Sequence, residues 1–419
     1  MSTLLLAWKS LLNRRFTVLL TICSIALAVA LLLGVERLRH EARSGFTATI
    51  SGTDLIVGAR TGSVQLLLYS VFRLGEATNN ISWQSYRQIA DHSRVAWTVP
   101  LSLGDSHRGY PVLGTNLDYF KYYRYADDRP LRLAEGELFE DIFEAVLGAE
   151  VARRLDYRLG REIIVAHGGS DVGFSRHDNH PFTVSGILEP TGTPVDNTVH
   201  IALEGFEAIH IGWETGVPLP GREVSPAEAR QKDLTPRSIT AFLVGLESRA
   251  ATFQLQRYIN QYPREPLLAI LPGVTLSQLW GVVGMAEQAL LLISWLVLLV
   301  GLLGMISVQL TNLEGRRREL AILRAVGAGP RHILLLICGE ALLLALVGAA
   351  AGVGLMYGLL LLATPLLESH FGLFIGVGAL GGRELWYLAI VIAAGLCSGL
   401  IPALRAYLQS LQGGITMRH

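Results

Sequence analysis

Four long apolar runs stand out in the pattern of hydrophobic and polar positions. The first, residues 16–35 (FTVLLTICSIALAVALLLGV), contains no charged residue, and the others occupy 287–310, 333–363 and 385–404. A helix needs about 20 mostly apolar residues to cross the hydrocarbon core of a bilayer. The pattern therefore predicts four transmembrane helices, the third long enough to tilt or to extend beyond the lipid.

The stretch between the first two runs, residues 36–284, has no apolar run of that length. Its strongest candidate, residues 64–74 (VQLLLYSVFRL), covers about half a span and contains Gln65 and Arg73. We expect this run in the core of a folded domain or lining a cleft, and a segment that dips into the membrane is the alternative.

The middle of the chain mixes two periodicities. Helical spacing of apolar residues appears in 143–155 and 247–262, while 205–236 is rich in proline, glycine and charge and predicts an exposed excursion. Short β-rich runs lie at 48–57, 94–103, 162–166, 181–188 and 239–244. The mixture predicts an α+β domain.

The placement of charge gives the orientation. Lysine plus arginine equals aspartate plus glutamate at 35 each, so no overall field favours nucleic acid as a partner. The basic residues instead flank the apolar runs: Lys9, Arg14 and Arg15, then Arg316, Arg317, Arg318, Arg324 and Arg331, and finally Arg405 and Arg418. Cytoplasmic flanks carry such an excess. We therefore expect 1–15, an amphipathic segment, together with 312–332 and 405–419 inside the cell, and 36–284 outside.

The first run also decides between an anchor and a signal peptide. It is longer than the apolar core of a signal peptide, and its A-x-A patterns lie inside it rather than after it. We expect an uncleaved anchor.

Candidate catalytic chemistry is sparse. The three cysteines, Cys23, Cys338 and Cys397, all fall in apolar runs, which removes a disulfide framework from the middle of the chain. None of the three lysines follows a glycine, so the Walker A phosphate loop is absent, as are the HExxH and GxSxG motifs. We expect a non-catalytic chain whose ATP is hydrolysed by a separate polypeptide.

The loop 312–332 (NLEGRRRELAILRAVGAGPRH) combines a basic stretch with a short amphipathic pattern. Leu313, Leu320, Leu323 and Val326 can share one helix face, and Gly327, Gly329 and Pro330 end the helix. A short helix at the cytoplasmic surface suits a docking element. The alternative is that the arginines serve only as topology signals.

Together these patterns resemble the MacB/FtsX family of ABC transporter permeases, which is related to the LolC/LolE permeases. The resemblance is carried by the loop 312–332, by 146–153 with Gly160 (VLGAEVARRLDYRLG) and by 401–416 (IPALRAYLQSLQGGIT). It implies an α-helical membrane protein with four transmembrane helices and a large α+β periplasmic domain inserted between helices 1 and 2. It also implies a multi-pass protein of the bacterial inner membrane.

The resemblance further implies a function. The chain is expected to be the permease subunit of an ATP-driven complex, a homodimer with two ABC ATPase subunits that hold ATP and magnesium, and a periplasmic adaptor or substrate-binding protein is a further candidate partner. The work would be export, or extraction of a membrane-anchored substrate. The alternative is an FtsX-like regulator of a periplasmic enzyme. The implied ATPase-coupling residues are Glu314, Arg316, Arg317, Arg318, Glu319, Leu320, Leu323 and Arg324.

Two further features carry candidate sites. Glu340 lies inside the third apolar run, where an ionisable side chain faces protein or water and has either a coupling or a structural role. Histidines cluster in the outer domain, and His177, His180, His200 and His210 are candidate zinc ligands, with ordinary loop or core histidines as the alternative. A metal-linked exporter is therefore a third reading.

Small residues in the apolar runs predict close helix packing. Gly301 and Gly304 lie in the second run, and Gly348, Gly352 and Gly354 lie in the third. Small residues let helix backbones approach each other in a membrane. We expect packing within one protomer in preference to a dimer seam.

Overall fold

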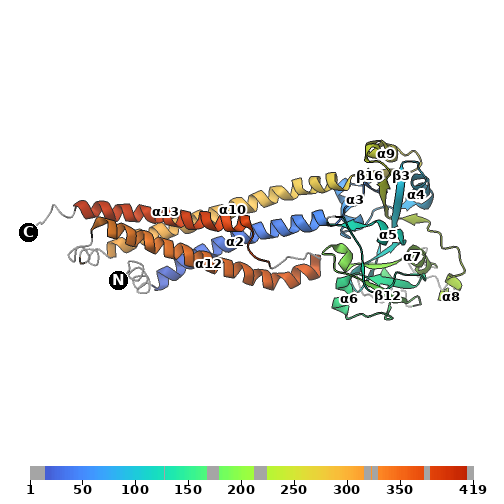
Figure 1. Ribbon diagram of the computed structural model, residues 1–419, viewed down its shortest axis with the longest axis horizontal. Coiled ribbons are helices and arrows are strands. Elements are labelled where there is room, and N and C mark those ends of the chain that lie inside the picture. Colours follow the sequence, from blue (N-terminus) through green and yellow to red (C-terminus); the bar gives the residue numbers. More distant parts are fainter. Residues whose placement is uncertain are drawn as a thin grey trace, which may run out of the picture. The chain divides into compact units, whose positions relative to one another are not determined.

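The computed structural model describes residues 15–126, 128–167, 179–211, 224–315, 322, 329–371 and 378–412. The chain divides into two compact units. One combines Met1–Ala42 with Val283–His419, and the other comprises Arg43–Val282. Figure 1 shows long helices in the first unit and a mixture of strands and short helices in the second.

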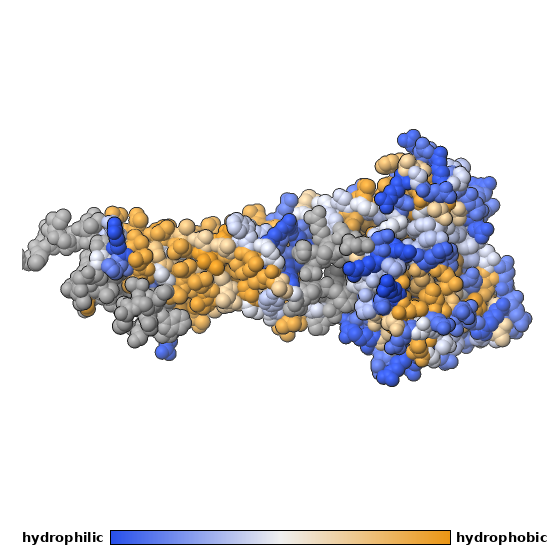
Figure 2. All heavy atoms as spheres, in the orientation of Figure 1, coloured by the Kyte–Doolittle hydropathy of each residue, from blue (hydrophilic) through white to orange (hydrophobic). Residues whose placement is uncertain are grey.

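The first unit is built from four long helices, α2 (Arg15–Ala48), α10 (Pro272–Gly315), α12 (Pro330–Phe371) and α13 (Gly382–Gln412). Each is long and apolar enough to span a membrane, and apolar residues cover much of the bundle surface in Figure 2. A soluble bundle would turn polar side chains outward, so this surface fits lipid. The candidate spans are Arg15–Arg39, Pro272–Thr311, Arg331–Thr364 and Gly382–Leu408.

Glycines set the packing of α12 against its neighbours. A Cβ at Gly352 would lie 2.6 Å from Val29 Cβ and 2.8 Å from the Ala26 carbonyl oxygen of α2, and Gly348 is equally close to Ile25. On its other side, α12 places Ala341 and Ala345 against Gly399 and Gly395 of α13. Packing of Gly348 and Gly352 within one protomer is thus confirmed, whereas Gly354 has open space beside it.

The second unit contains a four-stranded antiparallel sheet with strand order β16 (Leu267–Ile270), β1 (Leu55–Ala59), β15 (Ala241–Leu246) and β3 (Val95–Leu101). Alternate residues of β1 and β15 point to opposite faces. Leu55, Val57, Phe242 and Val244 pack with helices α4 (Trp83–Ala90) and α9 (Thr252–Asn260), while Ile56 and Leu243 enter a second core. Both faces are buried, which explains why these strands are apolar throughout.

A larger mixed sheet has the order β10 (Glu162–Ile163), β12 (Phe182–Leu188), β9 (Glu144–Leu147), β13 (Val199–Ala202), β5 (Tyr110–Thr115), β4 (Asp105–His107) and β11 (Ala166–His167), with β8 (Leu133–Gly136) beside β12. The β12–β9 and β13–β5 pairs are parallel and the other pairs are antiparallel. One core packs this sheet with helix α6 (Ala149–Leu155) and helix α7 (Leu203–Ile209). The second core contains residues of both sheets.

Short elements complete the second unit. They are α3 (Ser63–Ser70), β2 (Ile81–Ser82), α5 (Asp118–Tyr122), β6 (Arg124–Tyr125), β7 (Arg129–Pro130), η1 (Pro194–Asn197), α8 (Pro226–Ala229), β14 (Ser238–Ile239) and η2 (Arg249–Ala251). The apolar run 64–74 forms α3 and buries Leu66 and Leu67 in the core shared by the sheets. The core reading of that run is confirmed.

Several predicted elements differ from the observed ones. Residues 48–57 are not one strand, because α2 continues to Ala48 and β1 begins only at Leu55. The predicted helix over 143–155 is wrong in its first part, which is strand β9; its apolar residues face two sides of a sheet. The predicted helix over 247–262 is shorter, since α9 covers Thr252–Asn260. The segment 205–236 begins inside the core, because α7 buries Gly205, Ala208 and Ile209.

Candidate functional site

The predicted coupling loop falls largely outside the described residues. The backbone of α10 ends at Gly315, and the Glu314 side chain, Arg316, Arg317, Arg318, Glu319, Leu320, Leu323 and Arg324 all lie outside what the structure describes. Their role therefore stays a prediction.

Glu340 lies on α12 among the buried residues of the bundle. It is 8% exposed, and the neighbouring Ala341 and Leu344 belong to the bundle core. Its carboxylate therefore faces protein and has a polar or electrostatic interaction there.

His200 is a core residue. It lies on β13, is fully buried, and packs its ring against Tyr119 and Phe120. Its Nδ1 lies 3.2 Å from the Val146 carbonyl oxygen. Burial, reinforced by the charge of Arg73, lowers the pKa of His200 to about 3, so the imidazole is neutral across the physiological range.

The other histidines have separate surroundings. His180 stacks on Phe143, and burial lowers its pKa. His210 places Nδ1 2.6 Å from the Phe206 carbonyl oxygen and Nε2 3.5 Å from the buried Asp105 carboxylate. His177 lies outside the described residues. Among the residues that the structure describes, no group of three or more His, Cys, Asp or Glu side chains has the arrangement of a metal site.

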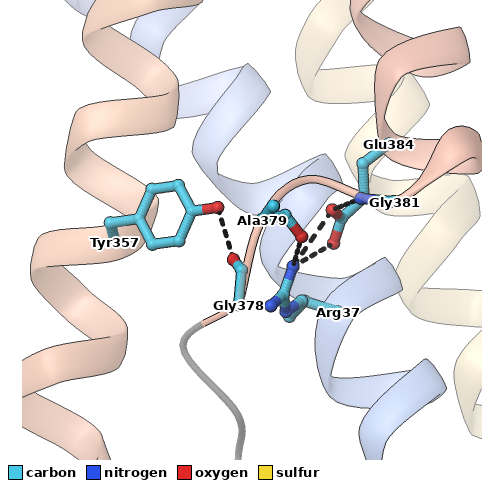
Figure 3. Close-up of polar contacts among 6 residues, drawn as sticks. All are labelled: Arg37, Tyr357, Gly378, Ala379, Gly381 and Glu384. Carbon is cyan, nitrogen blue, oxygen red and sulfur yellow. Dashed lines mark hydrogen bonds and ion pairs between the residues drawn. The ribbon is translucent and has the colours of Figure 1, made fainter.

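A charged cluster within the helical unit joins α2 to the start of α13. One guanidinium nitrogen of Arg37 donates to Glu384 Oε2 at 3.2 Å and to the Ala379 carbonyl oxygen at 3.0 Å. Both charged side chains are only 6% exposed. Figure 3 shows Arg37 reaching from α2 into the loop that precedes α13. The loop backbone and the carboxylate thus share one cation.

The loop is fixed from two further directions. Glu384 accepts a hydrogen bond from the Gly381 backbone at 2.7 Å, which caps α13 and places a carboxylate at the positive end of the helix dipole. From α12, the Tyr357 hydroxyl donates to the Gly378 carbonyl oxygen at 2.8 Å (Figure 3). A Cβ at Gly378 would lie 3.2 Å from the Arg37 guanidinium, so glycine leaves room for the cation.

A second, outer pair lies beside the first. Glu36 Oε1 accepts from Arg39 at 2.9 Å and lies 3.7 Å from a guanidinium nitrogen of Arg383. The order of charges is therefore reversed between the partners: Glu36 and Arg37 face Arg383 and Glu384. We call these four residues and the loop 378–381 the polar clamp.

The clamp is energetically consequential because the inner pair is buried. A buried ion pair itself adds little net stability, but removing one partner leaves an uncompensated charge and costs about 3–5 kcal/mol. The outer pair contributes less, since Arg383 is 74% exposed. The sequence analysis missed the clamp because its partners lie 347 residues apart and each resembles an ordinary charged flank of a span.

Family models match most of the chain. The MacB-like periplasmic core domain matches residues 18–262, and the FtsX-like permease C-terminal region matches residues 291–411. The chain belongs to the MacB/FtsX-like family of ABC transporter permeases. As a member of this permease family with four candidate spans, it is a multi-pass membrane protein.

Named relatives of this permease are export proteins. The chain is 31% identical over 235 residues to the macrolide export ATP-binding/permease protein MacB of Rhodospirillum rubrum, covering 54% of this chain and 32% of that protein. It is 26% identical over 234 residues to the pyoverdine export ATP-binding/permease protein PvdT of Pseudomonas fluorescens, covering 55% and 32%. The matches thus span about a third of the length of these curated relatives.

Solved structures give a weaker likeness. The periplasmic region of MacB from Actinobacillus actinomycetemcomitans superposes with a TM-score of 0.35 at 12% identity, covering 55% of this chain and 94% of that one. The extracellular domain of the ABC-type transporter YknZ from Gram-positive bacteria gives a TM-score of 0.30 at 13% identity, covering 52% and 99%.

Proposed function

We propose that this permease is the membrane subunit of an ATP-driven complex and that it moves its outer unit in response to ATP hydrolysed by a separate chain. The observation that carries the proposal is the match of 291–411 to the FtsX-like permease region, which contains most of three apolar helices and the basic inner loop. Two protomers with two ATPase chains would form the complex in the bacterial inner membrane.

The inner loop is the proposed contact with the ATPase. Its three consecutive arginines, Arg316 to Arg318, precede a leucine-bearing segment that can form one apolar helix face. The absence of a GxxxxGK motif in the sequence supports a separate ATPase. The outer unit, 36–284, would lie in the periplasm between the first and second spans.

The proposed work is export or extraction of a substrate that the outer unit meets. The relatives bear export names, and the match of 18–262 to a MacB-like core favours transport over regulation of a periplasmic enzyme. The bundle packs closely through glycine and alanine, which suits movement of the spans as rigid bodies in preference to opening a wide pore.

The test is co-purification with the cognate ABC ATPase from a co-expressing strain. Reversal of Arg316, Arg317 and Arg318 to glutamate is expected to abolish recovery of the ATPase and its permease-dependent activity. Reversal of the exposed Arg158 and Arg161 of the outer unit is the matched control and should leave recovery unchanged. Equal recovery with all variants would contradict the proposal.

A further inference from the structure

The polar clamp joins the first span to the start of the last. The inner pair, Arg37 with Glu384, is held by contacts between α2, the loop backbone at Ala379 and the first turn of α13. Tyr357 ties the same loop to α12. Three of the four long helices thus meet at one loop of the helical unit.

The position of Arg37 on α2 makes this junction more than a local cap. The second unit begins at Arg43, within α2, and Arg37 precedes it by less than two helical turns. A displacement of the loop that precedes α13 therefore acts on α2 close to where the chain enters the second unit.

The reversed order of charges resists sliding as well as separation. A shift of α2 that moved Arg37 away from Glu384 would bring it toward Arg383, and Glu36 would approach Glu384. Like charges at short range repel, and opposite charges in a site shielded from water attract strongly. The arrangement favours one relative position of α2 and α13.

We infer that Glu36, Arg37, Arg383 and Glu384 are positioning residues that keep α2 fixed to the start of α13 throughout the ATP cycle, so that movement of the last two spans is passed to the first. The inference rests on the proposed function. It assigns the clamp the role of a closed strut and not of a switch that opens.

The clamp can be cut without leaving a buried charge. In the double variant Arg37→Met/Glu384→Gln, both charges of the inner pair are gone, and the glutamine carbonyl can still accept from the Gly381 backbone. Replacing both members of a buried pair is tolerated far better than removing one. The single variant Arg37→Met, which leaves Glu384 unpaired, serves to show the structural cost alone.

The measurement is the ATP-dependent change in deuterium uptake of Arg43–Val282 in the full complex with its ATPase. In the double variant we expect normal recovery of the complex, a melting temperature close to that of the unmodified chain, and continued ATP hydrolysis. We expect the ATP-dependent uptake change to fall at least about fivefold, the lower end of typical coupling between sites.

A reversible cross-link then restores or withholds the connection. Cys23, Cys338 and Cys397 are first replaced by alanine, and Glu36→Cys/Arg383→Cys is added to the double variant. Closing the two thiols with a short bis-methanethiosulfonate reagent is expected to restore the uptake change, and dithiothreitol is expected to remove it again. A structural defect elsewhere would not follow the cross-link.

Three results overturn the inference. The double variant could retain the full uptake change, the cross-link could fail to restore it, or the cross-link could block it in a chain with an intact inner pair, which would make the clamp a switch. Failure of the proposed function is distinguishable: the unmodified chain would then recover no ATPase or show no ATP-dependent change.

Discussion

The buried His200 leads to a measurable acid sensitivity of the outer unit. Its folded pKa of about 3 lies far below its ordinary value of 6.5, because burial and the nearby Arg73 both oppose protonation. A histidine with a depressed folded pKa contributes stability above its unfolded pKa. That contribution is lost as the pH falls from 6.5 toward 3.

The size of the loss can be worked out at one pH. At pH 5 the imidazole is still neutral in the folded unit but is protonated in the unfolded chain. The expected loss of unfolding free energy between pH 8 and pH 5 is then about 2 kcal/mol, or roughly a 30-fold rise in the open population. The loss at pH 5 depends mainly on the unfolded pKa, because the folded group remains neutral.

The assay is hydrogen–deuterium exchange of the full-length protein in detergent, read on peptides that contain β9 and β13 and corrected for the intrinsic pH dependence of exchange. His200→Leu lacks the titrating group and is expected to lose about 2 kcal/mol less between pH 8 and pH 5 than the unmodified protein. Parallel losses in the two proteins would show that His200 is not buried as a neutral imidazole, and would refute the reasoning.

Three further predictions follow from burial and packing. Burial raises the pKa of Glu207 to about 7 against the opposing charge of Arg237, so its contribution, present at low pH, is lost as the pH rises through 7; Glu207→Gln should stabilise the unit at pH 8 by about 1 kcal/mol after solvent screening, measured by urea unfolding, and no change at pH 8 would contradict this. Gly352→Ala should lower the melting temperature in detergent because its Cβ overlaps Ala26 and Val29, at a cost of about 1–3 kcal/mol, whereas Gly354→Ala, with open space, should not. Gly245→Ala places a Cβ 2.1 Å from the Trp97 ring and should destabilise the outer unit by about 1–3 kcal/mol, with Gly62→Ala as a tolerated control; equal effects of the two would refute the packing argument.

The helical unit was largely predictable because lipid imposes a strong constraint. Each predicted run lies within one long helix, and the small residues at Gly348 and Gly352 indicated the close packing that is observed. Helix ends were less predictable: α10 begins at Pro272, before the predicted run at 287–310, because helices continue past the lipid without an apolar signal.

The outer unit was predictable in class but not in every boundary. Residues 143–155 show helical spacing, yet the first part is a strand buried on both faces, with Val146 in one core and Ala145 in another. Periodicity cannot separate a short strand of this kind from a buried helix. The signature around 146–160 was predicted correctly: β9 ends at Leu147, α6 follows, and Asp156 and Gly160 adopt positive φ in the turn.

The clamp lay beyond sequence reasoning for a different reason. Glu36, Arg37, Arg383 and Glu384 each stand next to an apolar run, where charged residues are common and carry no information about partners. The pairing appears only when residues far apart in the chain are brought together.

The glycine and alanine contacts of α12 have a consequence for how the bundle deforms. At Gly352 and Ala26, and again at Ala341 and Gly399, backbone meets backbone or a single methyl group. Neither seam contains a long side chain that could change rotamer and absorb a sideways shift. A displacement of α12 by a fraction of an ångström therefore has no slack to take it up, and α2 and α13 must follow it or lose contact altogether.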